Sequence, residues 1–232
     1  AANGYEAGKL AERERPDVLL LGGDYGVGRA SHADALELVT RLSQLAPTFG
    51  VLGNTDHHQG FDRQALREIL RASGGDLLIN EAGSVRIDGA SVEVLGVDDP
   101  LHGAADIDAT RAAAGDSADT RVGLCHSPAI WRDLPRLDAD LVLIGHTHGG
   151  QIRVPGFEAP VTHGSYPRGL AAGLFRLQPD RPPLRLVGHW PILRSRKPIR
   201  ASTADGPLMY VTRGIGMGVV PLRVMCPPEL AI

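Results

Sequence analysis

The chain has 232 residues, of which 43% are hydrophobic and 22% charged, a composition typical of a globular protein with a sizeable core. Its 24 Lys and Arg residues against 27 Asp and Glu give a net charge of -3, so we expect no surface for binding nucleic acid by bulk electrostatics. Two cysteines are too few for a disulfide framework, and no apolar run approaches the roughly 18–20 residues that span a bilayer.

The first third of the chain alternates short apolar runs with amphipathic stretches. Apolar runs that end at glycine are typical of strands buried on both faces, and apolar residues at helical spacing indicate helices that bury one face. In chain order, the patterns predict a polar helix over 1–15, a strand over 18–21, a helix over 31–45, a strand over 49–52 and a helix over 63–72. This alternation indicates a layered α/β fold with parallel strands.

The pattern then changes to more closely spaced strands. Turn residues separate predicted strands over 77–80, 84–87 and 91–97, a spacing that indicates antiparallel pairs. Further strands are predicted over 121–125, 141–144, 170–177, 184–187, 209–212 and 222–225. We expect one domain over 1–232, built as a two-sheet sandwich with helices outside, and an exposed insertion over 178–205, which contains a stretch rich in Pro and Arg.

Four of the apolar strands are each followed by a possible metal ligand. Asp24, Asn54 and His126 each follow such a strand, and His146 and His148 both follow the strand over 141–144. The carboxyl ends of strands are where α/β sheets bind ligands, so we expect these side chains to meet. Carboxylate, amide and imidazole donors suit Mn, Fe or Zn. Each residue alone has a plainer interpretation as a turn or core residue, and only the combination predicts a metal site.

The same loops resemble the motifs of the calcineurin-like metallophosphoesterases. Residues 145–152 read Gly-His-Thr-His-Gly-Gly-Gln-Ile and continue as Arg-Val-Pro-Gly, the signature of a bacterial branch of that family. The other matching segments are Gly22-Gly23-Asp24, Gly53-Asn54-Thr55-Asp56, His126-Ser127-Pro128, 210–216 and 226–229. The resemblance implies a four-layer α/β/β/α sandwich and a dinuclear metal centre that hydrolyses phosphate esters by attack of a metal-bound hydroxide.

The family pattern implies a role for each ligand. Asp24 bridges two divalent ions, while Asn54, His126 and His146 complete the second site and His148 belongs to the first. The family's first block, an Asp-x-His at the end of its first strand, has no counterpart in this sequence. The first site therefore lacks two ligands, and we expect the second site to be the more complete one. We expect the missing strand to lie upstream, in a longer parent chain.

The residue after Asn54 also departs from the family pattern. Thr55 stands where the family usually has a histidine that contacts the phosphate and protonates the leaving group. A threonine hydroxyl donates a hydrogen bond but is no acid near neutral pH. His57 is the candidate substitute acid, with an exposed loop histidine as the alternative. Asp56 is predicted to orient a ligand or a loop, against the alternative of a turn-stabilising aspartate.

Other residues have two interpretations each. Arg213, in a glycine-rich loop, is predicted together with Asn54 to contact the substrate phosphate, against the alternative of a surface salt bridge. Asp98-Asp99-Pro100 resembles a loop of this branch or is an ordinary Asp-Pro turn. Cys125 is expected to pack in the core. The basic residues around Trp190 either contact an anionic lipid surface or lie in a solvated loop.

We therefore predict a metal-dependent phosphoric ester hydrolase, a phosphodiesterase or phosphatase acting on a phosphodiester, phosphomonoester or pyrophosphate bond. The alternative is a catalytically impaired relative that binds a phosphorylated ligand or a single metal, because the first block is absent and Thr55 replaces a histidine. The expected substrate is a phosphorylated small molecule or a lipid-linked one. An upstream segment would allow peripheral membrane contact, and the sequence leaves a cytoplasmic and a membrane-associated location both open.

Overall fold

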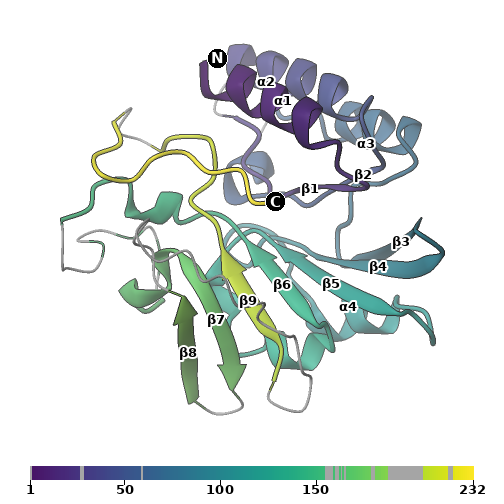
Figure 1. Cartoon of the computed structure of the whole chain (residues 1–232), viewed down its shortest axis with the longest axis vertical. Coiled ribbons are helices and arrows are strands. Elements are labelled where there is room, and N and C mark those ends of the chain that lie inside the picture. Colours follow the sequence, from purple (N-terminus) through teal and green to yellow (C-terminus); the bar gives the residue numbers. More distant parts are fainter. Residues whose placement is uncertain are drawn as a thin grey trace.

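The computed structural model describes residues 2–26, 29–58, 60–154, 159, 162, 164, 166–178, 181–187, 206–218 and 222–232 (Figure 1). Its α-helices are α1 (Ala2–Glu14), α2 (Arg29–Leu42), α3 (Arg63–Ala72) and α4 (Ile107–Ala112). Its strands are β1 (Leu19–Leu21), β2 (Thr48–Gly50), β3 (Glu81–Ile87), β4 (Ala90–Val97), β5 (Thr120–Cys125), β6 (Leu141–Ile144), β7 (Gly173–Gln178), β8 (Arg181–Val187) and β9 (Leu208–Val211). Its 3-10 helices are η1 (Asn54–His57), η2 (Pro128–Ile130), η3 (Leu134–Leu137), η4 (His148–Gly150) and η5 (Arg168–Ala171).

The strands form two sheets. The parallel strands β1 and β2 make a 2-stranded sheet, and the other strands make a 7-stranded sheet in the order β3-β4-β5-β6-β9-β7-β8. Strands β4, β5, β6 and β9 run parallel to one another, while β3, β7 and β8 pair antiparallel. The predicted antiparallel pair of β3 and β4 and the predicted two-sheet arrangement are both confirmed.

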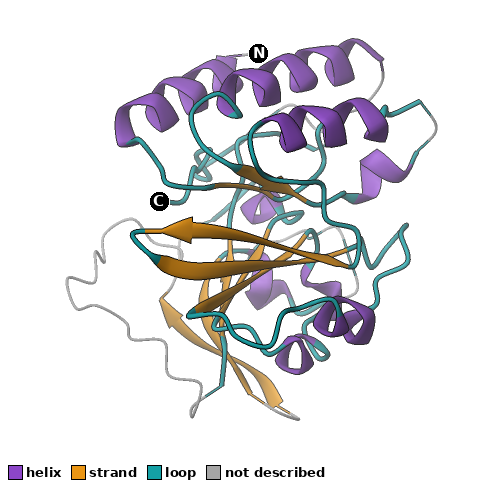
Figure 2. Ribbon diagram, turned by 90° about the vertical axis from the view of Figure 1, so that its right-hand side faces the viewer, coloured by secondary structure: helices purple, strands orange, loops and turns teal. Residues whose placement is uncertain are grey.

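The layers follow the α/β/β/α order that the sequence predicted (Figures 1 and 2). Helices α1, α2 and α3 cover the small sheet, and α4 lies with short helices on the far face of the large sheet. Among the described residues, four apolar clusters fill the interior, and the smallest of them joins α1, α2 and β1 through Ala11, Leu42 and Leu19. Leu66 and Leu70 of α3 pack with Leu52 in one cluster. Phe49 and Leu78 pack in another, between the two sheets. The largest cluster covers the face of the large sheet that is turned away from the small sheet.

The carboxyl-terminal parts of the central strands are mainly apolar because both of their faces are buried there. On β4, Val94 packs between the two sheets while the next residue, Leu95, packs in the cluster on the other side. On β6, Val142 and Ile144 face that outer cluster and Leu143 faces the small sheet. Alternation of side chains along a strand sends successive residues to opposite layers, so both need apolar residues.

Two predicted strands are wrong, and the one predicted over 170–177 begins only at Gly173, after η5. Residues 77–80 and 222–225 contribute only the isolated bridges Gly50↔Leu77 and Ile152↔Val224. Asn80 has a φ of 55° and Met225 a φ of 51°, and a left-handed residue ends an extended run. Apolar patterning indicates burial or pairing, but it does not report this local reversal of the backbone.

The predicted insertion over 178–205 stays a prediction. Its described part is β8, which pairs antiparallel with β7 at one edge of the large sheet. Residues 179–180 and 188–205, with the basic cluster around Trp190, lie outside the described residues, as do Pro155 and Gly156 of the signature. Within the described ranges, no helix combines the length and apolar character that a membrane crossing requires.

Substituting Leu78 tests the packing between the sheets. Leu78 is 2% exposed, and a Cβ added at Gly96 of β4 would come within 2.2 Å of the Leu78 Cβ. We expect Leu78→Ala to lower the free energy of unfolding by about 2–5 kcal/mol, because the substitution leaves a cavity that is enclosed by the two sheets. Leu45→Ala, at a position that is 39% exposed, is the matched control and should cost less than about 0.5 kcal/mol. Equal losses in urea titrations would contradict this account of the core.

Candidate metal centre

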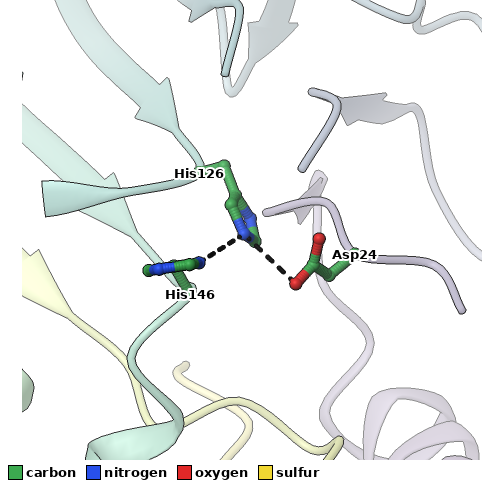
Figure 3. Close-up of side chains that lie close together, drawn as sticks. All are labelled: Asp24, His126 and His146. Atoms are coloured by element: carbon green, nitrogen blue, oxygen red, sulfur yellow. Dashed lines mark hydrogen bonds and ion pairs between the residues drawn. The ribbon is translucent and has the colours of Figure 1, made fainter. Parts of the chain in front are cut away.

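The carboxyl ends of four strands meet where the two sheets adjoin. Asp24 follows β1 and Asn54 follows β2, both in the small sheet, while His126 follows β5 and His146 follows β6 in the large sheet. Figure 3 shows Asp24 and His146 on either side of His126. The predicted convergence of these side chains is therefore a feature of the structure, and it joins one sheet to the other.

The Nε2 atom of His126 is the point on which the other donors converge. It lies 3.3 Å from Asp24 Oδ2, 3.2 Å from Asn54 Oδ1 and 3.1 Å from His146 Nδ1. Two ligand atoms that are each about 2.1 Å from one ion lie about 3.0 Å apart at a right angle and about 3.4 Å apart at a tetrahedral angle. The three distances fall within that interval. This donor set therefore fits a single divalent ion of the second predicted site.

The orientation of the His126 ring is set by a backbone carbonyl. Its Nδ1 lies 2.6 Å from the oxygen of Gly22, and a carbonyl oxygen only accepts, so Nδ1 carries the proton. Nε2 is then the nitrogen that faces Asp24, Asn54 and His146, and its lone pair would bind an ion once Nε2 is deprotonated. A histidine held in this way by a hydrogen bond behind it is the usual arrangement of a metal ligand. His126 is 1% exposed, which keeps water from competing for either nitrogen.

Two glycines allow the loops after β1 and β2 to touch. Gly23 has a φ of 86°, and a Cβ added there would lie 2.4 Å from the backbone nitrogen of Gly53. A Cβ added at Gly53 would lie 2.3 Å from Asp24 Oδ1. Side chains at either position would push the carboxylate of Asp24 away from Asn54. The glycines that precede the two ligands are thus required by close approach of the backbone.

Asp24 is held in its ionised form. Burial opposes ionisation, but hydrogen bonds and the charge of His126 outweigh it, so the pKa of Asp24 lies below its ordinary value. Thr55 contributes two of these hydrogen bonds, from its backbone nitrogen at 3.0 Å and its hydroxyl at 2.9 Å to Asp24 Oδ1. Burial lowers the pKa of His126, but the pairing with Asp24 outweighs it and the pKa rises. The raised pKa refers to the proton on Nε2, between His126 and Asp24, and a bound ion would take the place of that proton.

Asp56 ties the two small-sheet loops together from behind. Its Oδ2 accepts hydrogen bonds from the backbone nitrogens of Asp24 and Gly53, both at 2.8 Å, and its Oδ1 accepts from Tyr25 at 2.9 Å. The side chain is fully buried, and burial together with the charge of Asp24 raises its pKa to about 6 although the three hydrogen bonds oppose this. Asp56 thus holds both the loop of Asp24 and its own turn at Gly53, which fits the orienting role and the alternative of a turn-stabilising aspartate alike, and the orienting role stays a prediction.

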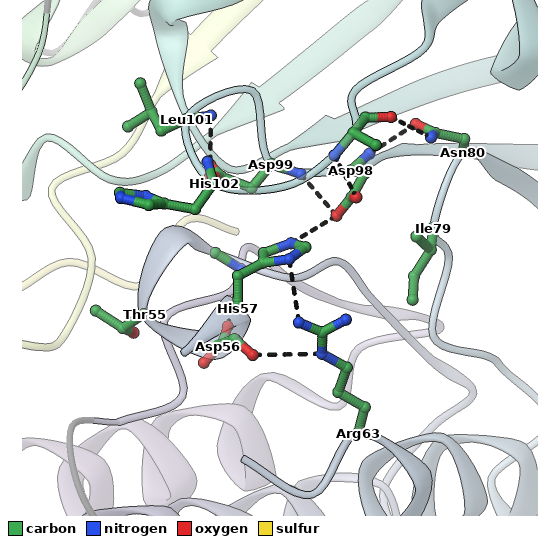
Figure 4. Close-up of polar contacts among 12 residues, drawn as sticks. Thr55, Asp56, His57, Arg63, Ile79, Asn80, Asp98, Asp99, Leu101 and His102 are labelled. Carbon is green, nitrogen blue, oxygen red and sulfur yellow. Dashed lines mark hydrogen bonds and ion pairs between the residues drawn. The ribbon is translucent and has the colours of Figure 1, made fainter. Parts of the chain in front are cut away.

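His57 is engaged on both sides of its ring (Figure 4). Its Nδ1 lies 3.1 Å from Nη2 of Arg63, which can only donate, so Nε2 carries the proton and donates to Asp98 Oδ1 at 2.8 Å. Among the described residues, these partners do not belong to the group around His126. The role of His57 as an acid stays a prediction, and its contacts favour a role in holding η1, which carries Asn54.

The loop after β6 is held by left-handed residues and by distant parts of the chain. His146 and His148 have φ values of 64° and 49°, and Thr147 between them donates its hydroxyl to the carbonyl of Ala171 at 2.6 Å. The carbonyl of His148 accepts from Cys226 Sγ at 3.3 Å and from Arg223 Nη1 at 3.1 Å. Among the described residues, His148 lies outside the three-residue donor group of Asp24, His126 and His146, and its place in the first metal site stays a prediction.

Arg213 takes the alternative that the sequence left open, an ion pair. Its Nε and Nη2 lie 3.3 Å and 3.2 Å from the two carboxylate oxygens of Glu229, and both side chains are 17% exposed. Glu229 also accepts from the hydroxyl of Tyr210 at 2.6 Å. Burial raises the pKa of Glu229, but these hydrogen bonds outweigh it and lower the pKa. A phosphate contact by Arg213 stays a prediction.

Three positioning residues escaped the sequence analysis. Arg63 lies in the helix predicted over 63–72 and Arg223 in the strand predicted over 222–225, and the sequence predicts a role for neither; for Asp98 it leaves open a loop of the family branch and an ordinary turn. Asp98 accepts from His57 and from the backbone nitrogens of Asp99 and Ala104, each at 2.8 Å. A charged residue between apolar neighbours is the only signal that pointed to Arg223. Cys125 is fully buried, as predicted, and burial raises its pKa to about 12.

Asp56→Asn tests the support behind Asp24. An amide nitrogen cannot accept, so at least one of the three backbone donors would lose its partner. We expect the affinity for Mn²⁺ to fall about 10–100-fold in calorimetric titrations. Asp62→Asn is the matched control, because Asp62 accepts one bond from Ala65 with a single oxygen and an amide oxygen replaces it. Equal Mn²⁺ affinity in wild type and Asp56→Asn would contradict the role given to Asp56.

Arg223→Ala tests the support behind the loop after β6. The variant removes the donors to the carbonyls of His148 and, at 2.8 Å, of Arg213. We expect Mn²⁺ affinity to fall about tenfold, with Arg223→Lys intermediate because one ammonium cannot hold the two carbonyls in the same fork. Arg136→Ala, at a side chain that is 54% exposed, is the control. If Arg223→Ala behaves as Arg136→Ala does, the loop does not depend on Arg223.

The sequence model of the calcineurin-like phosphoesterase family matches residues 6–150. The phosphodiesterase YaeI of Escherichia coli is 34% identical over 231 residues, which cover 96% of this chain and 72% of that protein. A metallophosphoesterase of Aquifex aeolicus is 28% identical and covered to 74%, and YkuE of Bacillus subtilis is 26% identical and covered to 67%. The solved sulfate thiohydrolase SoxB of Thermus thermophilus overlaps 63% of this chain and 34% of its own, at 19% identity and a TM-score of 0.47. The chain belongs to the calcineurin-like phosphoesterase family and is a metal-dependent phosphoric ester hydrolase.

Proposed function

We propose that this chain hydrolyses phosphodiester bonds and that the group around His126 holds one of the ions it needs. The observation that carries the proposal is the convergence of Asp24, Asn54 and His146 on His126 Nε2, within 3.3 Å. The relative from E. coli, which is 34% identical, is named a phosphodiesterase. The substrate would be a phosphorylated small molecule or a lipid-linked one.

The residues of this chain would share the work as follows. Asp24, Asn54, His126 and His146 would hold one divalent ion, Mn, Fe or Zn, and Asp24 with His148 would contribute to a second. Bound divalent ions polarise phosphoryl oxygens and lower the pKa of water, which supplies a nucleophile near neutral pH. The protein's own part is to hold the donors ionised or correctly protonated: the Gly22 carbonyl holds the His126 tautomer, and Thr55 and Asp56 hold Asp24.

The local chemistry favours esters whose leaving groups depart without a proton. The hydroxyl of Thr55 already donates to Asp24, and both nitrogens of His57 are engaged. Neither side chain is therefore free to protonate an alkoxide near neutral pH. Aryl oxides and phosphates leave as stable anions and need no such acid. We infer that aryl diesters and pyrophosphate bonds are cleaved faster than simple alkyl diesters.

A second candidate function is a binding module for a phosphorylated ligand. Thr55 in place of a histidine favours it, because the residue that commonly assists the leaving group is absent from that position. Such a module would bind Mn²⁺ and phosphate at the same residues without turnover. Only a rate measurement separates the two functions.

The test is hydrolysis of bis(4-nitrophenyl) phosphate with added Mn²⁺. We expect metal-stimulated release of 4-nitrophenol, and we expect Asp24→Asn to lower kcat/KM by at least about 100-fold, since a direct ligand should matter more than the residues behind it. Asp34→Asn makes the same chemical change at an exposed position of α2 and should retain the wild-type rate.

The outcomes separate the two candidates. Turnover that needs Mn²⁺ and is lost only in Asp24→Asn supports the hydrolase. Binding of Mn²⁺ and inorganic phosphate by the wild type, with no turnover, supports the binding module. Full activity of Asp24→Asn would overturn the assignment of the metal group.

A further inference from the structure

Exposed apolar side chains gather at one place on the described surface. Six of the eleven large apolar residues that are exposed lie at 152–154, 217 and 222–225, whereas the other five are scattered along the chain. The six, which we call the apolar ridge, are Ile152 (39% exposed), Val154 (48%), Met217 (46%), Leu222 (51%), Val224 (39%) and Met225 (55%). Concentration of apolar surface in this way marks a binding surface more often than scattered residues do.

The segments 152–154 and 222–225 of the ridge are joined by backbone hydrogen bonds. Ile152 forms a parallel bridge with Val224, in which the nitrogen of Arg153 donates to the carbonyl of Val224 at 3.0 Å and the nitrogen of Val224 donates to Gln151 at 2.9 Å. The side chain of Gln151 donates to the carbonyl of Leu222 at 3.2 Å. Ile152 and Val224 are therefore held side by side, and Gly218, next to Met217, is tied to the same place by donating its backbone nitrogen to the side chain of Gln151.

In both segments of the ridge, the charged side chain is turned inward and the apolar side chains are exposed. Between the exposed Ile152 and Val154, Arg153 is only 9% exposed. Between the exposed Leu222 and Val224, Arg223 turns inward to the carbonyls of His148 and Arg213. Alternation along an extended chain normally sends the charged residue to water and the apolar residue to the core. Here both segments send arginine inward and aliphatic side chains outward.

The ridge adjoins the metal-binding loop. A Cβ added at Gly218, next to Met217, would lie 3.7 Å from Nε2 of His148. Cys226, next to Met225, donates its thiol to the carbonyl of His148. Residues next to the ridge therefore lie against His148, which is predicted to hold the first metal ion.

We propose that the ridge binds a hydrocarbon chain of the substrate itself, so that the substrate is an amphiphilic phosphoester. The inference rests on the proposed function and narrows its substrate class. The occupant must be apolar, because Arg153 and Arg223, the arginines within these segments, point away from the exposed surface. We place it as an extension of the phosphate ester, because Gly218 and Cys226, the neighbours of Met217 and Met225, lie against His148.

The test is a series of 4-nitrophenyl phosphodiesters in which the second ester group is methyl, butyl or octyl, each below its micelle concentration. Complete burial of a methylene is worth roughly fourfold in binding, so a half-covered chain should raise kcat/KM about twofold per methylene. Leu222→Ser and Met225→Ser should reduce this increment. Leu45→Ser and Leu184→Ser, at exposed apolar residues elsewhere, are the matched controls and should keep it.

The outcomes distinguish this inference from the proposed function. Hydrolysis of the methyl ester without any gain from longer chains overturns the inference and leaves the proposed function intact. Absence of metal-dependent hydrolysis of every ester overturns both. Co-sedimentation of the wild type with phosphatidylcholine vesicles, lost in the ridge variants and without a chain-length effect, would make the ridge a membrane-docking surface and overturn the inference as stated. Melting curves of each variant confirm that it is folded.

Discussion

The hydrogen bond from His126 to the carbonyl of Gly22 is the contact on which the site depends. It joins β5 of the large sheet to the loop after β1 of the small sheet at 2.6 Å, and it fixes which nitrogen of the ring faces the other donors. Without it, the imidazole is free to turn, and the spacing of 3.1–3.3 Å between Nε2 and the neighbouring donors would be lost. One hydrogen bond thus links the packing of the two sheets to the orientation of Nε2, the predicted metal-binding nitrogen of His126.

The architecture explains why such a contact is possible. Parallel strands bring their carboxyl ends to one edge, and stacking two sheets brings two such edges together. The loops can then approach closely because glycines stand at 23 and 53, where any side chain would meet the opposite loop. Behind them lie two carboxylates, Asp56 in η1 and Asp98 directly after β4, each accepting three hydrogen bonds that hold loops in place. The ligands are therefore positioned by the fold before any ion arrives.

Much of this arrangement was predictable from the sequence, and the misses share a cause. Helix α3 was predicted with its observed bounds, and the order of Asp24, Asn54, His126 and His146 at strand ends predicted their meeting. Periodicity reports burial within a segment, and a motif reports residue type at a fixed spacing. Neither reports a contact such as that of Arg223 with His148, which joins residues 75 positions apart. The contacts of His57 with Asp98 and with Arg63 were missed for the same reason. The reversal at Asn80 was missed because φ is set by local packing.

The most direct test of the central claim is the anomalous scattering of manganese in crystals grown with Mn²⁺. The account predicts a peak about 2.0–2.3 Å from His126 Nε2, with Asp24, Asn54 and His146 completing its ligands. A fully loaded crystal in which manganese binds elsewhere, while His126 contacts His146 directly, would contradict it.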